Sequence, residues 1–130
     1  MTSVPYRLET TNDHLTSRAG LACVAQVMES LQLGKLVDHA FPAPGGNRGY
    51  RPSDYVSTFV MMLHEGGRCL DDVRHLKNEL VLMNLLGFNS LPSSDALGDW
   101  LRRLGRGKVG LKALAQVNKP MMQRVINMLS

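Results

Sequence analysis

The sequence is poor in aromatic residues and cysteines and has no long apolar run. Aromatic residues make up 5% of the 130 residues, so aliphatic side chains must fill the core, which favours a helical assembly over a sheet sandwich. Cys23 and Cys69 are the only cysteines, and two cysteines cannot supply a disulfide framework. The hydrophobic content of 44% is nevertheless enough to build one domain core.

Signals for secretion and membrane insertion are also missing. Residues 1–15 form a polar lead-in that carries Glu9 and Asp13, without the apolar segment of a secretory signal. The longest apolar runs, such as residues 60–63, fall far short of the roughly 20 residues that a membrane helix needs. We therefore expect a soluble, cytoplasmic protein without a membrane partner.

The overall charge is a weak guide to function. The formal net charge is +4 and the sequence pI is about 9.4, a mild basic bias that suits nucleic-acid binding but is also ordinary for a soluble protein. The sequence contains no Walker loop, no GxGxxG pattern and no recognisable Ser-His-Asp arrangement. Composition and short motifs therefore leave the function class open.

Apolar residues recur at three- and four-residue steps, the spacing of amphipathic helices. We expect an all-α fold, a compact bundle of about six or seven short helices, with a short strand at residues 4–8. A helix-turn-helix-like unit is expected from the segments 69–77, 80–86 and 93–104. The predicted helices cover residues 21–31, 36–41, 53–64, 69–77, 80–86, 93–104 and 111–129.

Glycines and prolines mark the expected ends of these helices. Gly34 is expected to interrupt the first apolar stripe, and Pro52 fits the first position of a new helix. Pro120 divides the last stretch, either as a kink or as the start of a separate helix. The domain boundaries follow as a lead-in over 1–15, a helical domain over 16–118 and a C-terminal helix over 119–130. The expected inward residues are Val56, Phe59, Val60 and Leu63, then Leu70, Val73 and Leu76, then Leu97, Trp100 or Leu101, and Leu104.

A basic group near the end of the chain is the first candidate site. On a helix end and the glycine-rich turn after it, these side chains could lie beside phosphates. The alternative is a surface of ordinary ion pairs, because Asp99 stands three and four residues before the first two arginines. The group consists of Arg102, Arg103, Arg106, Lys108 and Lys112.

The glycine-rich loop at residues 42–51 is the second candidate. Arg48 and Arg51 could grip phosphates, and Tyr50 could stack on a base or sugar. The alternative is a structural loop in which Tyr50 packs on the core. The sequence leaves both interpretations open.

A metal site is not expected. His64, Cys69, Asp71 and His75 are separated by five, two and four residues across a Gly-Gly break, unlike the tight ligand pairs of zinc sites. Asp71 and His75 are expected to form a helix-surface pair, and Cys69 to be a small core residue.

The last helix carries an apolar face that needs a cover. Met122, Val125, Ile126 and Leu129 share one side of it, as expected for an assembly surface. This face is expected to fold back on the helix at 53–64, to pair with a second copy, or to meet a domain beyond Ser130.

Four blocks resemble the N-terminal region of the "thirteen-eighty" group of insertion-sequence transposases, in DDE group 1. Four ordered blocks are far more specific than one motif. The resemblance covers roughly residues 4–126. The blocks are LTSRAGL at 15–21, PAPGGNRGYRPSDYV at 42–56, GGRCLDDVRHL at 66–76 and LPSSDALGDWLRR at 91–103.

The resemblance implies a role in DNA transposition inside a prokaryotic cell, near the nucleoid. In that family an RNase H-like domain follows the helical region, and its three acidic residues bind two Mg²⁺ or Mn²⁺ ions. The first acid lies in an apolar strand similar to Leu-Asp-Ile-Asp, and this chain has no such strand. We therefore assign no catalytic residue and no cofactor, and expect no enzymatic activity from this chain alone.

The expected function is that of an N-terminal DNA-binding and assembly segment of a DDE transposase. Its implied partners are double-stranded DNA at terminal inverted repeats and a second copy or a full-length transposase. One alternative is a helical dimerisation module without DNA contact. Another is a truncated transposase that inhibits the full-length enzyme by forming mixed dimers.

Overall fold

A computed structural model describes residues 20–42, 49–77 and 90–129, and these residues are all helix, turn and loop. The all-α prediction is therefore confirmed. Three expected segments lie outside the described residues: the strand at 4–8, the lead-in over 1–15 and the helix at 80–86. The expected helix-turn-helix-like unit includes the helix at 80–86, so it stays a prediction. The helices are α1 (Leu21–Ser30), α2 (Leu33–Ala40), α3 (Pro52–His64), the 3₁₀ helix η1 (Leu70–Asp72), α4 (Val73–Lys77), α6 (Ser94–Leu104) and α7 (Val109–Leu129).

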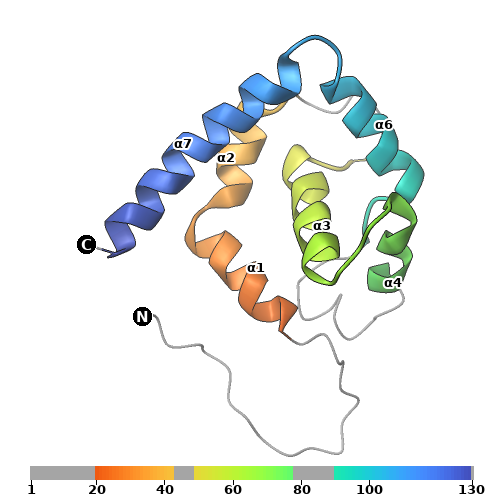
Figure 1. The fold of residues 1–130 in the computed structure, drawn as a ribbon, viewed down its shortest axis with the longest axis horizontal. Coiled ribbons are helices and arrows are strands. Elements are labelled where there is room, and N and C mark those ends of the chain that lie inside the picture. Colours follow the sequence, from red (N-terminus) through yellow and green to blue (C-terminus); the bar gives the residue numbers. More distant parts are fainter. Residues whose placement is uncertain (1–19, 43–48, 78–89, 130) are drawn as a thin grey trace, which may run out of the picture.

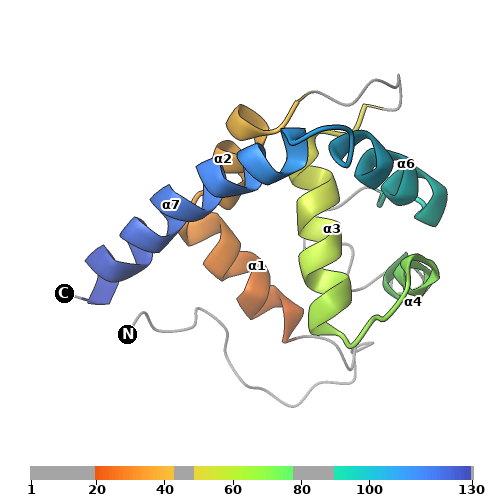
Figure 2. The same cartoon turned by 45° about the horizontal axis from the view of Figure 1, so that its top comes forward.

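Helix α3 lies at the centre of the arrangement (Figure 1). It packs against α2 on one side and against α4 on the other, while α6 packs on η1. The chain then turns at one end of the molecule, and α7 runs back along α2 (Figure 2). Along the described parts of the chain, no helix has the length and apolar character to cross a membrane.

Two carboxylates fix the start of α3. Pro52 takes the first helical position as predicted, and Asp54 Oδ2 accepts a hydrogen bond from Arg51 N at 2.8 Å. Asp38 on α2 accepts from Ser53 N at 2.8 Å and from Ser53 Oγ at 2.9 Å. The two bonds from Ser53 to Asp38 join α2 to α3. They also cap α3, because the Ser53 N–H in its first turn has no partner within the helix.

The core is centred on Trp100, which is 3% exposed. Its ring stacks on Tyr55 at 5.0 Å between centroids, and Phe41 lies 5.6 Å away. Leu101 is 42% exposed, so the structure selects Trp100 as the inward residue of α6. The aromatic side chains among the described residues thus gather in one cluster between α2, α3 and α6.

The predicted buried face of α3 is partly wrong. Leu63 is 63% exposed, whereas Tyr55, Thr58 and Met62 are buried. The reason is that α2 and α4 pack on two sides of α3 and bury the side that carries Tyr55, Thr58 and Met62. Thr58 can be buried because its hydroxyl donates to the carbonyl of Asp54 at 2.7 Å.

The first interruption occurs at Gln32 and not at the expected Gly34. Gln32 has a φ of 54°, a left-handed conformation, and Gly34 continues within α2. Local hydrogen bonds explain the position, because Leu31 N and Gln32 N donate to the carbonyls of Val27 and Glu29 and close α1 there. At the end of α3, by contrast, a glycine takes the left-handed conformation: Gly66 has a φ of 85°, two residues after the last helical residue, His64.

Helix α7 is continuous from Val109 to Leu129 with Pro120 inside it. Of the two alternatives for Pro120, the start of a separate helix is therefore not found. Contacts on both sides of Pro120 hold the helix: Val117 is buried, and Arg124 Nη1 donates to the carbonyl of Leu31. These contacts also place α7 against α2 and the α1–α2 turn instead of α3.

Candidate nucleic-acid interface

Charge is strongly segregated along the chain. Residues 100–130 contain seven Lys and Arg residues and no Asp or Glu, whereas residues 1–99 contain eight basic and eleven acidic residues. The net charge is therefore +7 in the last 31 residues and −3 in the rest. A segment with one sign of charge attracts polyanions much more strongly than the modest total charge implies.

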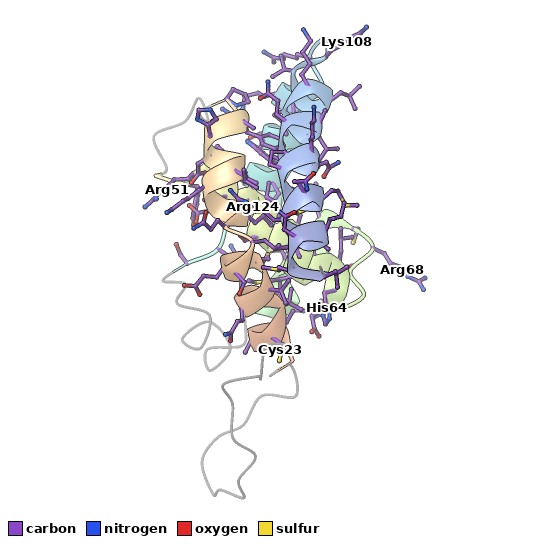
Figure 3. All side chains as sticks on the ribbon, turned by 90° about the vertical axis from the view of Figure 1, so that its left-hand side faces the viewer. Cys23, Arg51, His64, Arg68, Lys108 and Arg124 are labelled. Carbon is purple, nitrogen blue, oxygen red and sulfur yellow. The ribbon has the colours of Figure 1, made fainter. Side chains whose placement is uncertain are left out.

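The structure places this basic segment on the last part of α6, the following turn and α7. Arg102, Arg106, Lys108 and Lys112 are exposed, and Arg103 is half-buried. Lys108 extends from the end of the molecule where α6 passes into α7 (Figure 3). The last turn of α6 suits the arginines, because cations stabilise the negative end of a helix. The five predicted residues thus follow one another along the end of α6, the turn and the start of α7, a segment here called the basic end.

The ion-pair alternative holds for one member of the basic end. Arg102 Nη1 lies 2.6 Å from Asp99 Oδ1 in an exposed pair. For Arg103, Arg106, Lys108 and Lys112, no carboxylate partner is found within the described ranges 20–42, 49–77 and 90–129. Within those ranges, these four side chains can therefore meet an external anion without first breaking an ion pair.

The predicted loop site is not brought together with the basic end. Arg51 is exposed and extends on the α2 side, away from Lys108 (Figure 3). Arg48 lies outside the described residues. The structure therefore supports Arg51 only as a separate contact point.

Tyr50 is a structural residue of this loop. Its hydroxyl donates to the carbonyl of Leu91 at 3.1 Å and lies 3.0 Å from Ser90 Oγ. Its ring meets Tyr55 edge-on, with 5.9 Å between centroids. The structure thus favours the structural alternative over base stacking, because the ring already covers the core.

The residues considered for a metal site do not converge. His64 pairs with Glu65, and no group of three potential ligands occurs in the described parts of the chain. Two predictions are corrected here. Asp71 lies beside Arg74 and His75 beside Asp72, each at 3.9 Å, so the expected Asp71–His75 pair is wrong. Cys69 is exposed and not a core residue, because it precedes η1 in extended backbone.

The apolar stripe of α7 is largely exposed. Met122 is 56% exposed, Ile126 53% and Leu129 83%, while Val125 is half-buried. Near the start of the helix Leu111 continues the stripe at 71% exposure. It is the side of α7 away from α2, so packing within the described residues leaves it uncovered.

An apolar groove adjoins the same stripe. Leu111 and Leu114 form part of its wall, and the groove reaches inward to Phe41 and Trp100 with a volume of about 420 Å³. The stripe and this groove together offer a continuous apolar surface beside the basic end.

Sequence reasoning missed one exposed cation of α7. Lys119 stands seven residues after Lys112 and therefore lies on the same side of the helix. The complete absence of acidic residues after Asp99 is the signal that would have extended the candidate site along α7.

No family model, curated protein or solved structure matches this chain.

Proposed function

We propose that this chain is the N-terminal DNA-binding and assembly segment of a DDE transposase. The segregated charge carries the proposal: seven basic residues and no acidic residue lie in the last 31 residues, and most of them are exposed around one end of the molecule. The four sequence blocks that resemble insertion-sequence transposases support the family. In this proposal the chain itself is not an enzyme, and Mg²⁺ or Mn²⁺ belongs to a separate catalytic domain.

The proposed partner is double-stranded DNA at terminal inverted repeats, close to the nucleoid. Arg and Lys side chains that neutralise phosphates release condensed counterions, which makes duplex affinity fall steeply with salt. Arg103, Arg106 and Lys108 are the central contacts, because they are close together in the sequence and have no carboxylate partner in the described part of the chain. Arg102 contributes after its exposed pair with Asp99 opens, at little cost.

Duplex binding measured by fluorescence anisotropy at several salt concentrations tests this function. Replacing Arg103, Arg106 and Lys108 with Gln should weaken binding at low salt. Each lost phosphate contact should reduce the slope of log affinity against log salt by roughly 0.9. The matched control replaces Lys35, Arg68 and Arg74 with Gln, which removes the same charge from exposed positions elsewhere. Equal effects of both triple variants would contradict a localised DNA surface.

The second candidate is a helical self-association module without DNA contact. The exposed stripe of Leu111, Met122, Ile126 and Leu129 favours it. Mixed dimers through this surface would also let such a chain inhibit a full-length transposase. A chain that self-associates but does not bind duplex DNA at low salt would favour this candidate over the first.

A further inference from the structure

Helix α7 has three distinct faces. Ala113, Val117 and Arg124 face the body of the molecule, and the apolar stripe occupies a second side. A third stripe follows three- and four-residue steps along the whole helix, so its members share one face. It consists of Lys112, Gln116, Lys119, Gln123 and Asn127, and all five are exposed.

The composition of this third face is unusual for a solvated helix. Exposed faces ordinarily mix both signs of charge, whereas this one combines two lysines with three amides and has no carboxylate. Lysines bind phosphates, and Gln or Asn side chains can pair with both hydrogen-bonding groups on the major-groove edge of adenine. The same five positions thus offer both kinds of group that duplex recognition requires.

The amide of Gln123 is held in place. Its Nε2 donates to Asn127 Oδ1 at 3.1 Å, which restrains a side chain that is otherwise free to rotate. Its Oε1 can accept a hydrogen bond and its Nε2 carries a second hydrogen, so the exposed amide still offers the acceptor and the donor that an adenine edge needs.

The dimensions of α7 fit a DNA groove. Its 21 residues span about 30 Å, and the major groove, about 12 Å wide, admits one α-helix. Gln116 and Gln123 stand seven residues apart, about 10 Å along the axis, which corresponds to about three base-pair steps. The C-terminal turns of α7 extend beyond α2 in both ribbon views (Figures 1 and 2), so that part of the helix projects from the body.

We propose that α7 is the sequence-reading helix of this protein. Gln116 and Gln123 contact base edges in the major groove, and Lys112 and Lys119 bind the flanking phosphates. The basic end then holds the adjacent backbone. This inference rests on the proposed DNA-binding function and adds to it the element and side chains that read sequence.

Selection of bound duplexes from a random-sequence pool, using the whole chain, tests the inference. The wild-type chain should enrich a motif. Replacing both Gln116 and Gln123 with Ala should lower the preference for that motif over random duplex by about tenfold or more, with the salt slope unchanged. Ala favours helix, so the fold should persist, as circular dichroism can verify. Gln26→Ala, at an exposed position on α1, is the matched control and should retain the motif.

The outcomes separate the two proposals. Salt-dependent binding without any enriched motif would overturn the reading role of α7 while leaving the DNA-binding function intact. Retention of the full preference by the Gln116→Ala, Gln123→Ala variant would overturn it as well. Absence of duplex binding by the wild-type chain at low salt would remove both proposals together.

Discussion

Single aspartates organise the helix starts of this molecule. Asp54 caps α3 from within, Asp38 reaches the same helix from α2, and Asp72 accepts from two backbone donors before η1. Carboxylates favour these positions because helix N-termini present unpaired N–H groups and a partial positive charge. Each of these hydrogen bonds therefore stabilises a helix start.

Asp72 should give the fold a dependence on acidity. Hydrogen bonds from Arg68 N at 2.6 Å and then Cys69 N at 3.2 Å lower the pKa of Asp72 below its ordinary value of 3.8. Because the folded pKa is depressed, the contribution is complete above about 3.8 and is lost as the pH falls through the folded pKa. Asp72→Asn should therefore be less stable than wild type at neutral pH, and the difference should shrink in acid.

Urea unfolding across a pH series measures this effect. Asp71→Asn is the matched control, because the Asp71 carboxylate lies beside an exposed Arg74 instead of backbone donors. A gap between wild type and Asp72→Asn that is the same at pH 7 and in strong acid would contradict the role given to the carboxylate.

Asp38 should contribute to the α2–α3 junction. Asp38→Ala removes two acceptors, leaving the Ser53 N–H of the first turn of α3 without its partner. The expected loss of unfolding free energy is about 1–2 kcal/mol, as for other helix caps. Glu29→Ala, an exposed acidic position on α1, is the control in the same urea titration. Equal stability of the two variants would argue against this junction.

At the scale of the helices, the sequence predicts ends better than faces. Pro52 starts α3, and Ser93 and Gly105 bound α6, because caps act through their own neighbouring backbone. The buried side of α3 depends instead on where α2 and α4 lie, so the apolar Leu63 remained exposed. The choice between the two alternatives at Pro120 also depends on tertiary contacts, since Val117 and Arg124 hold α7 on either side of it.

The candidate site shows a similar division. The grouping of the basic end could be predicted because its five residues follow one another from the end of α6, through one turn, to the start of α7. The roles of Tyr50 and Cys69 could not, because Tyr50 bonds to Leu91, about forty residues later, and Cys69 lies exposed in extended backbone. Local adjacency is visible in a sequence, whereas tertiary partners are not.

The apolar stripe of α7 is expected to mediate self-association. Met122 and Ile126 are more than half exposed in the single chain, so a dimer through this stripe would bury their apolar surface. Replacing both with Gln removes that apolar surface and should therefore lower the sedimentation coefficient at high protein concentration. Ending the chain at Asn118 would also remove the stripe residues Met122 and Ile126. It is a poorer test of self-association, because it removes the hydrogen bond from Arg124 to the Leu31 carbonyl as well. An unassociated wild-type chain at high concentration would contradict the assembly role.

At the scale of the whole molecule, charge divides the protein into two parts. Residues 1–99 carry a net charge of −3, and the last 31 residues carry +7 on α6, its following turn and α7. Because phosphates are attracted to positive charge, DNA is expected to meet the basic end of the molecule. The central claim is that this end is the DNA surface.

Backbone amide NMR during titration with duplex DNA tests that claim most directly, because it locates the contact without altering a residue. The account predicts that shifts concentrate between Arg102 and Asn127, and that they shrink when salt is raised. Amides of α1 and α4 should change little. Shifts centred on α1 or α4, or shifts of equal size at low and high salt, would contradict the account.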